Sequence, residues 1–176
     1  TIEPRKGYLQ TIEAFTELWN EGVDINLVIV GREGWKDLPD DMRRDIPKTI
    51  ERLRNHPELN KRLFWLDGIS DEYLEKVYAA STCLIAASYG EGFGLPLIEA
   101  AQHKLPIIAR DIPVFREVAG EHAFYFTGIE ANDLAETIKS WCVLFDKNQH
   151  PTSEDMPWLT WKESAKELIN VIMKDF

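Results

Sequence analysis

The sequence predicts an α/β protein built on a doubly wound parallel sheet. Short apolar, β-branched runs recur along the chain, and stretches whose apolar residues return every three to four positions lie between them. Strands that alternate with helices are joined by right-handed crossovers, so the strands run parallel and helices cover both faces of the sheet. The ligand crevice of such a sheet lies at the carboxyl ends of its strands.

The elements follow in a regular order. The first helix is predicted at 6–19, where Leu9, Ile12 and Phe15 share one face, and it ends before Gly22. The apolar run 25–30 then predicts a strand buried on both faces. Further strands are predicted at 63–66, 82–86, 106–109 and 123–126, and further helices at 71–80, 95–103, 113–119 and 131–145.

Two segments depart from this alternation. Residues 40–56 are charged and helical in pattern, and we expect a solvated layer that Pro47 kinks or divides. Residues 146–157 are polar and contain two prolines, after which a helical pattern resumes at 158–173. The sequence therefore predicts one domain over 1–145, followed by a linker and a terminal helix over 146–176.

The composition limits the function classes. Twenty Lys and Arg against 30 Asp and Glu give a formal net charge of −10, which disfavours nucleic acid or an acidic membrane as partner, because such binding needs clustered basic residues. No apolar run approaches the ~20 residues of a membrane span. Cys83 and Cys142 form neither a disulfide framework nor a metal cluster, so we expect both in the core and the protein in a reducing compartment.

The clearest chemical signal lies in residues 88–100, between a predicted strand and a predicted helix. This segment holds three glycines within five positions and then Pro96 in the first helical turn. The N–H groups of Gly94, Leu95 and Leu97 are expected to point out of the helix start, where the helix dipole favours phosphate or diphosphate. The segment thus predicts an anion-binding loop.

Two carboxylates flank this loop. Glu91 precedes the helix and Glu99 lies about one turn inside it, so the two are placed to reach opposite ends of a bound diphosphate compound. Carboxylates accept hydrogen bonds from hydroxyls, which suits a sugar and a ribose. A simple glycine turn with solvent-facing glutamates is the alternative interpretation, because a glycine-rich turn alone is a weak signal.

The stretch from Glu91 to Glu99 resembles the E-x7-E signature of the retaining family 4 glycosyltransferases. Residues 3–7, 31–35 and 68–71 also resemble segments of that family, in its order and approximate spacing. The resemblance runs from about Glu3 to at least Ala123. It implies a GT-B architecture, in which two Rossmann-like halves face a cleft, and the chain matches the C-terminal, nucleotide-sugar-binding half. Residues 146–176 would then pack on this half and extend toward an N-terminal acceptor-binding domain.

The resemblance also assigns roles to individual residues. Lys6 would neutralise the donor diphosphate and Glu91 would hold hydroxyls of the donor sugar, which makes these two the catalytic candidates. The remaining candidates would bind the donor: Arg5 beside the diphosphate, Gly92, Phe93, Gly94 and Leu95 in the loop that offers backbone N–H groups, Glu99 at the ribose, and Gly68 and Ile69 at the base. The leaving diphosphate is expected to assist attack on the same face, and the scheme requires no metal or other cofactor.

The expected function is transfer of a sugar to a glycan or lipid-linked acceptor in surface polysaccharide synthesis. Residues 31–35 and 110–117 look similar to bacterial mannosyltransferases, which favours GDP-mannose as donor, while UDP-sugars stay open. A non-catalytic nucleotide-sugar-binding module is the alternative. Nothing precedes Thr1, so the acceptor half and its histidine are expected to be missing, and the fragment should bind without turnover. We expect a cytoplasmic location, with peripheral association with the inner membrane through the missing half as an open alternative.

Overall fold

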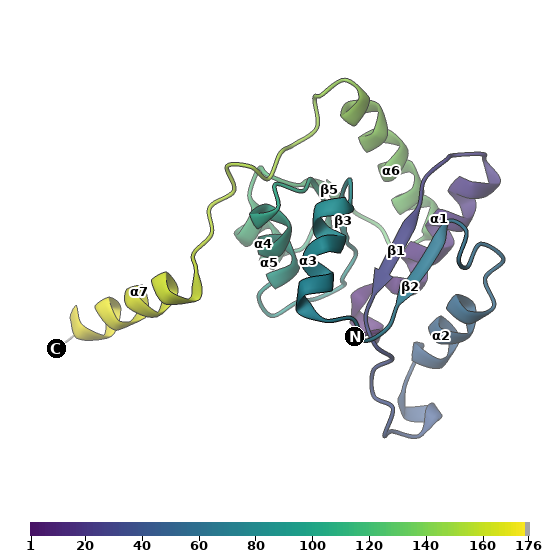
Figure 1. Ribbon diagram of the computed structural model, residues 1–176, viewed down its shortest axis with the longest axis horizontal. Coiled ribbons are helices and arrows are strands. Elements are labelled where there is room, and N and C mark those ends of the chain that lie inside the picture. The colour runs from purple at the N-terminus through teal and green to yellow at the C-terminus, as the bar shows by residue number, and fades with distance from the viewer. Residues whose placement is uncertain (175–176) are drawn as a thin grey trace.

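The computed structural model describes residues 1–174 (Figure 1). Its helices are α1 (Tyr8–Asn20), α2 (Ile46–Arg54), α3 (Asp71–Ala80), α4 (Leu95–Gln102), α5 (Pro113–Ala119), α6 (Ala131–Asp146) and α7 (Trp161–Lys174), with 3₁₀ turns η1 (Pro4–Lys6) and η2 (Asp40–Met42). Its strands are β1 (Leu27–Val30), β2 (Leu63–Leu66), β3 (Leu84–Ala86), β4 (Ile107–Arg110) and β5 (Phe124–Phe126). The predicted α/β alternation is confirmed, and β2, α3 and α5 have the predicted bounds.

The described strands run parallel, as predicted, but they form two ladders instead of one sheet. β1 pairs with β2, whereas β3, β4 and β5 pair in that order. No strand among residues 1–174 pairs with both β1 and β3. The N-terminal segment reaches only their carboxyl ends, where the Ile2 N–H donates to the Arg32 carbonyl and the Tyr89 N–H donates to the Arg5 carbonyl, both at 2.7 Å. The parallel α/β class is as predicted, and the sequence does not predict the division into two ladders, because periodicity identifies strands without identifying their neighbours.

The core consists of two buried clusters. The larger one joins α1 and α6, which pack against each other, to α2 and to one face of β1; the other joins α4 and α5 to β4. β1 buries Leu27 and Ile29, yet Val28 between them is 41% exposed. The predicted burial of β1 on both faces is therefore wrong. An apolar hollow of about 240 Å³ separates the Val28 face from α3, so this helix does not seal it.

The charged segment 40–56 forms more than a solvated layer. Pro47 does not kink a long helix; it lies in the first turn of α2, where its missing N–H costs nothing. α2 buries Ile46, Ile50 and Leu53 against the larger core cluster. The predicted division of the segment at the proline is thus close to the structure, and the predicted solvation is wrong on the face that packs.

The linker packs on the domain and the terminal helix does not. The Ser153 hydroxyl donates to the Leu105 carbonyl at 2.7 Å, and both Ser153 and Met156 are buried. α7 extends away from the rest of the chain (Figure 1), and its apolar residues are exposed, with Trp161 at 80%. The expected packing of this helix on the domain is therefore not observed, because no described surface covers its apolar residues. No helix within residues 1–174 is long and apolar enough to cross a bilayer.

Candidate functional site

The start of α1 lies directly against the carboxyl end of β3. Gly7, the N-cap of α1, has a φ of 71°, and a Cβ at this position would stand 2.2 Å from the Ala87 carbonyl oxygen. Only glycine permits both the backbone conformation and the approach. Because η1 ends at Lys6, this contact brings Arg5 and Lys6 to the loop that follows β3.

Glu91 is the centre of a polar cluster in that loop. Arg5 Nη1 donates to Glu91 Oε2 at 2.6 Å, Ser88 Oγ donates to Oε1 at 2.8 Å, and Lys6 Nζ forms an ion pair with Oε1. Only 8% of the Glu91 side chain is exposed. Burial raises the pKa of Glu91, but the hydrogen bonds from Lys6, Arg5 and Ser88 outweigh it and hold the pKa below its usual value. The carboxylate is therefore charged at neutral pH and fixed by three side chains.

The charges of this cluster are balanced without a ligand. Glu3 Oε2 lies 3.2 Å from Arg5 Nε, so Arg5 pairs with Glu3 as well as with Glu91. Two cations thus face two carboxylates. An anion that binds Lys6 or Arg5 therefore competes with a carboxylate of the cluster.

Backbone donors at the start of α4 lie in the same loop. The N–H groups of Phe93, Gly94 and Leu95 donate to no group in the described part of the chain. They are available to an anion, as the sequence predicts for Gly94 and Leu95. Leu97 differs, because its N–H donates to the Gly94 carbonyl at 2.9 Å and closes the first turn. The prediction of an open N–H at Leu97 is wrong.

Glu99 is held by a side chain from α3. The Tyr78 hydroxyl donates to Glu99 Oε2 at 2.7 Å, and the Tyr78 ring stacks on His103 with centroids 5.4 Å apart. His103 Nε2 in turn lies 2.7 Å from Glu75 Oε2. Burial, reinforced by the hydrogen bond to Glu99, raises the pKa of Tyr78, so the phenol keeps its proton and remains a donor. Glu99 is therefore oriented before any ligand arrives.

Gly68 and Ile69 lie in the loop between β2 and α3, next to the ladder of β1 and β2. The Arg32 side chain, at the end of β1, lies against Gly68. The structure thus joins Arg5, Lys6 and Glu91 in direct contact and places Gly92, Phe93, Gly94, Leu95 and Glu99 on the adjoining loop and helix. It shows no hydrogen bond or ion pair from Gly68 or Ile69 to Glu91 or Glu99 within residues 1–174.

The sequence does not predict the contacts of two positioning residues of the site, Ser88 with Glu91 and Tyr78 with Glu99. Ser88 lies three residues before Glu91, a spacing at which a hydroxyl can reach the carboxylate, so a local signal was present. Tyr78 lies 21 residues from Glu99 and on another helix. Only the packing of α3 beside α4 brings that pair together.

Arg110 and Arg116 stay outside the site. Arg116 forms two hydrogen bonds with Asp111, at 2.7 and 2.8 Å, so both side chains are engaged in a salt bridge between α5 and the loop after β4. Arg110 is buried, stacks on Tyr89 with its guanidinium carbon 4.3 Å from the ring centroid, and donates to the Ala87 carbonyl at 3.1 Å. Its role is to brace the end of β3.

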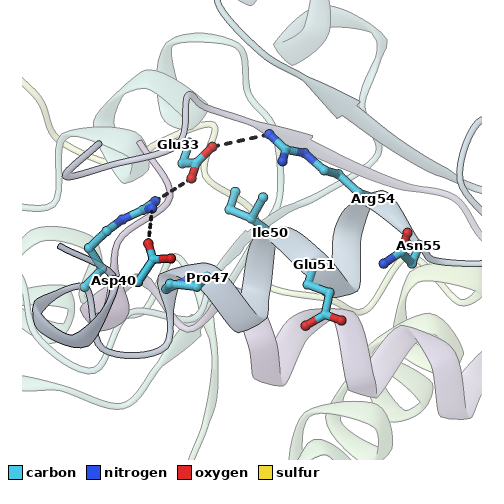
Figure 2. A pocket seen from close by; sticks show the side chains of 8 residues that line it. Glu33, Asp40, Pro47, Ile50, Glu51, Arg54 and Asn55 are labelled. Atoms are coloured by element: carbon cyan, nitrogen blue, oxygen red, sulfur yellow. Dashed lines mark hydrogen bonds and ion pairs between the residues drawn. The ribbon is translucent and has the colours of Figure 1, made fainter. Parts of the chain in front are cut away.

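A separate hollow of about 370 Å³ lies along α2 (Figure 2). Glu33 in its wall pairs with both Arg43 and Arg54, and Arg43 also donates to Asp40 at 2.9 Å. None of the predicted site residues lines it. These ion pairs fasten η2 and α2 to the loop after β1, and we interpret the hollow as structural. Within residues 1–174 no group of three or more His, Cys, Asp or Glu side chains is arranged to hold a metal ion.

Comparison with known proteins identifies the family. The family described as glycosyl transferases group 1 matches residues 1–151. The chain belongs to this family. The resemblance carried by the Glu91–Glu99 stretch is therefore confirmed.

Two relatives of this group 1 glycosyltransferase chain are mannosyltransferases by name. The serotype-specific mannosyltransferase WbdA of Escherichia coli is 56% identical over 169 residues, covering 96% of the chain and 20% of that protein. The O-antigen chain mannosyltransferase RfbU of Salmonella typhimurium is 32% identical over 98 residues, covering 56% of the chain and 28% of that protein. The chain thus spans about a fifth of the length of the WbdA relatives.

A solved structure agrees with the GT-B fold class. Anabaena HepE in complex with UDP-glucose matches with a TM-score of 0.65 and 22% identity, covering 88% of the chain and 40% of HepE. Because this identity is low, the match supports the fold alone.

Proposed function

We propose that the chain is the donor-binding half of a retaining mannosyltransferase that transfers mannose from GDP-mannose to a glycan or lipid-linked acceptor in surface polysaccharide synthesis. The observation that carries this proposal is the joining of Lys6 and Arg5 to Glu91 beside the open N–H groups of α4, with Glu99 one turn further along the helix. The names of the WbdA and RfbU relatives support mannose as the sugar and a polysaccharide as the product.

The diphosphate takes the positive groups of the cluster. Lys6 and Arg5 exchange their bonds to Glu91 for bonds to phosphate oxygens, while the N–H groups of Phe93, Gly94 and Leu95 donate to the same anion at the start of α4. This exchange frees oxygens of Glu91. Ser88, whose hydroxyl is bound to Oε1, keeps the carboxylate in place for hydroxyls of the sugar.

The nucleoside extends from the diphosphate along α4. Glu99, oriented by Tyr78, accepts hydrogen bonds from the two ribose hydroxyls. Gly68 and Ile69 border the base at the carboxyl end of β2, which is where a parallel sheet leaves its crevice. Lys6 and Glu91 thus face the reacting end of the donor, and Glu99, Gly68 and Ile69 face its nucleoside.

The transfer needs charge stabilisation at the leaving group. The bond between the anomeric carbon of mannose and the diphosphate oxygen breaks, and the acceptor oxygen bonds to that carbon from the same face. The acceptor proton passes to the departing diphosphate oxygen. Lys6 and Arg5 stabilise the negative charge that develops there, the largest contribution such a site makes. We propose no metal ion in this step.

The acceptor site belongs to the rest of the enzyme. Because the chain spans 20% of the length of WbdA, we propose that a separate acceptor-binding domain faces this half across a cleft. The chain alone is then expected to bind the donor without transferring mannose.

Calorimetric titration of the chain with GDP, GDP-mannose, UDP and UDP-glucose tests the proposal. We expect GDP and GDP-mannose to bind more tightly than the UDP compounds. Lys6→Ala and Glu99→Ala each remove a hydrogen bond to or from a charged group, which weakens GDP binding by about tenfold or more. Lys166→Ala, which removes the same charge from α7, is the matched control and leaves the affinity unchanged.

Two outcomes would contradict the proposal. A folded chain that binds none of the four compounds is not a donor-binding half, and a chain that prefers UDP-glucose uses a different donor. Transfer of mannose by the full-length enzyme, and its loss in Lys6→Ala, then separates an enzyme from a non-catalytic binding module.

A further inference from the structure

The Arg32 side chain covers Gly68 where β1 and β2 end. A Cβ on Gly68 would stand 3.1 Å from Arg32 Nε and 3.2 Å from Nη2, and the φ of Gly68 is 71°. A side chain at this position would therefore strain the backbone and crowd the guanidinium, which would have to shift by a few tenths of an ångström. The glycine leaves room for Arg32 at the edge of the loop that precedes α3.

The backbone that carries Arg32 is fixed on both sides. The Arg32 carbonyl accepts a hydrogen bond from the Ile2 N–H at 2.7 Å, and the Gly31 carbonyl accepts one from Trp65 Nε1 at 2.8 Å. Arg32 thus projects from a rigid support between the N-terminal segment and β2. Less conformational freedom is lost when such a side chain binds a ligand.

The Arg32 guanidinium forms no hydrogen bond or ion pair within residues 1–174. Two other arginines near this loop behave differently, since Arg43 and Arg54 both pair with Glu33, the residue that follows Arg32. Figure 2 shows the pair of Glu33 with Arg54. The chain carries a net charge of −10, so acidic partners are abundant. An unpartnered guanidinium on a fixed backbone is a group available to a ligand.

The proposed donor site directs the nucleoside toward this guanidinium. The diphosphate lies at the start of α4, and the ribose lies at Glu99, which Tyr78 ties to α3. The N-terminal segment links this site to Arg32, because the Ile2 N–H donates to the Arg32 carbonyl while Arg5 donates to Glu91. The base lies at the opposite end of the ribose from the diphosphate, and the proposed donor site places it at Gly68 and Ile69, beside Arg32.

We infer that Arg32 reads the base and selects guanine over uracil, an inference that rests on the proposed function. The planar fork of N–H donors on arginine matches the adjacent O6 and N7 acceptors of guanine. Uracil offers no such adjacent pair, because its N3–H separates its two carbonyl oxygens. Arg32 can form two hydrogen bonds with guanine and only one with uracil.

Titration with GDP, UDP and 7-deaza-GDP, in which a CH group replaces N7, tests this role. For the unaltered chain we expect GDP to bind about tenfold more tightly than UDP, with 7-deaza-GDP between the two. Arg32→Ala lowers the affinity for GDP until the preference over UDP and over 7-deaza-GDP is lost. Arg32→Lys keeps the charge without the fork and loses the preference as well.

Lys36→Ala is the matched control, since it removes one positive charge from the same loop and is expected to leave the preference intact. If Arg32→Ala weakens GDP and UDP equally, or still discriminates between GDP and 7-deaza-GDP, Arg32 does not read the base, and the proposed function stands. If the unaltered chain is folded by circular dichroism and binds no nucleotide, the proposed function fails and this inference fails with it.

Discussion

Gly7→Ala tests whether the contact between α1 and β3 builds the site. The φ of 71° lies in the left-handed region, which costs a residue with a Cβ about 1–2 kcal/mol. The added methyl group would stand 2.2 Å from the Ala87 carbonyl oxygen, so α1 must move away, and such overpacking costs about 1–3 kcal/mol. We therefore expect the free energy of unfolding to fall by about 2–5 kcal/mol.

The displacement has a second consequence for ligand binding. Arg5 and Lys6 precede Gly7 directly, so a shift of the α1 start separates them from Glu91 and disperses the cations that bind the diphosphate. The affinity of Gly7→Ala for GDP falls as well. Urea unfolding followed by tryptophan fluorescence measures the first effect, and calorimetric titration at a temperature where the variant is folded measures the second.

Gly22→Ala is a closely matched control. Gly22 has a φ of 84°, and a Cβ there would meet nothing within 4 Å. This variant carries the conformational cost of about 1–2 kcal/mol without the collision, and it leaves the site in place. Equal losses of stability in Gly7→Ala and Gly22→Ala, or unchanged GDP affinity in Gly7→Ala, would refute the argument from close approach.

Three further predictions concern other parts of the chain. Tyr78→Phe keeps the ring on His103 but removes the hydrogen bond to Glu99, so GDP affinity falls about tenfold while the urea midpoint changes little; a large fall in the midpoint would indicate a structural role only. The pKa of Glu91 in the folded chain is lowered from 4.5, so its charge stabilises the fold above pH 4.5, and this contribution is lost as the pH falls through the lowered value. In urea titrations between pH 7 and 3, Glu91→Gln should therefore be less stable than the parent at pH 7, and the difference in stability should narrow below pH 4.5. A difference that stays constant with pH would contradict this. Removal of residues 161–176 leaves the urea midpoint unchanged, because residues 161–173 of α7 are exposed, and lowers any self-association measured by sedimentation velocity; a lower midpoint would show that α7 packs on the domain.

Much of the fold could be predicted because its signals are local. The hydrophobic periods of 71–80 and 113–119 and the run 63–66 give elements with the observed bounds. The glycines and Pro96 predict the strand-to-helix loop with its open N–H groups, and the spacing of Glu91 and Glu99 places both carboxylates near it. The wrong prediction of an open N–H at Leu97 has a local cause too, because this N–H donates to the carbonyl of Gly94, the N-cap of the same helix.

The sequence by itself determined which residues form strands and helices and which loop carries the donors and carboxylates, because periodicity, caps and turns act over a few neighbouring residues. The tertiary structure alone decided the division into two ladders, the exposed face of β1 and the unpacked α7. It also decided the partners of the carboxylates, since Lys6 meets Glu91 across 85 residues and Tyr78 meets Glu99 from another helix. Such contacts depend on how elements pack in space, and no local period of the chain encodes that.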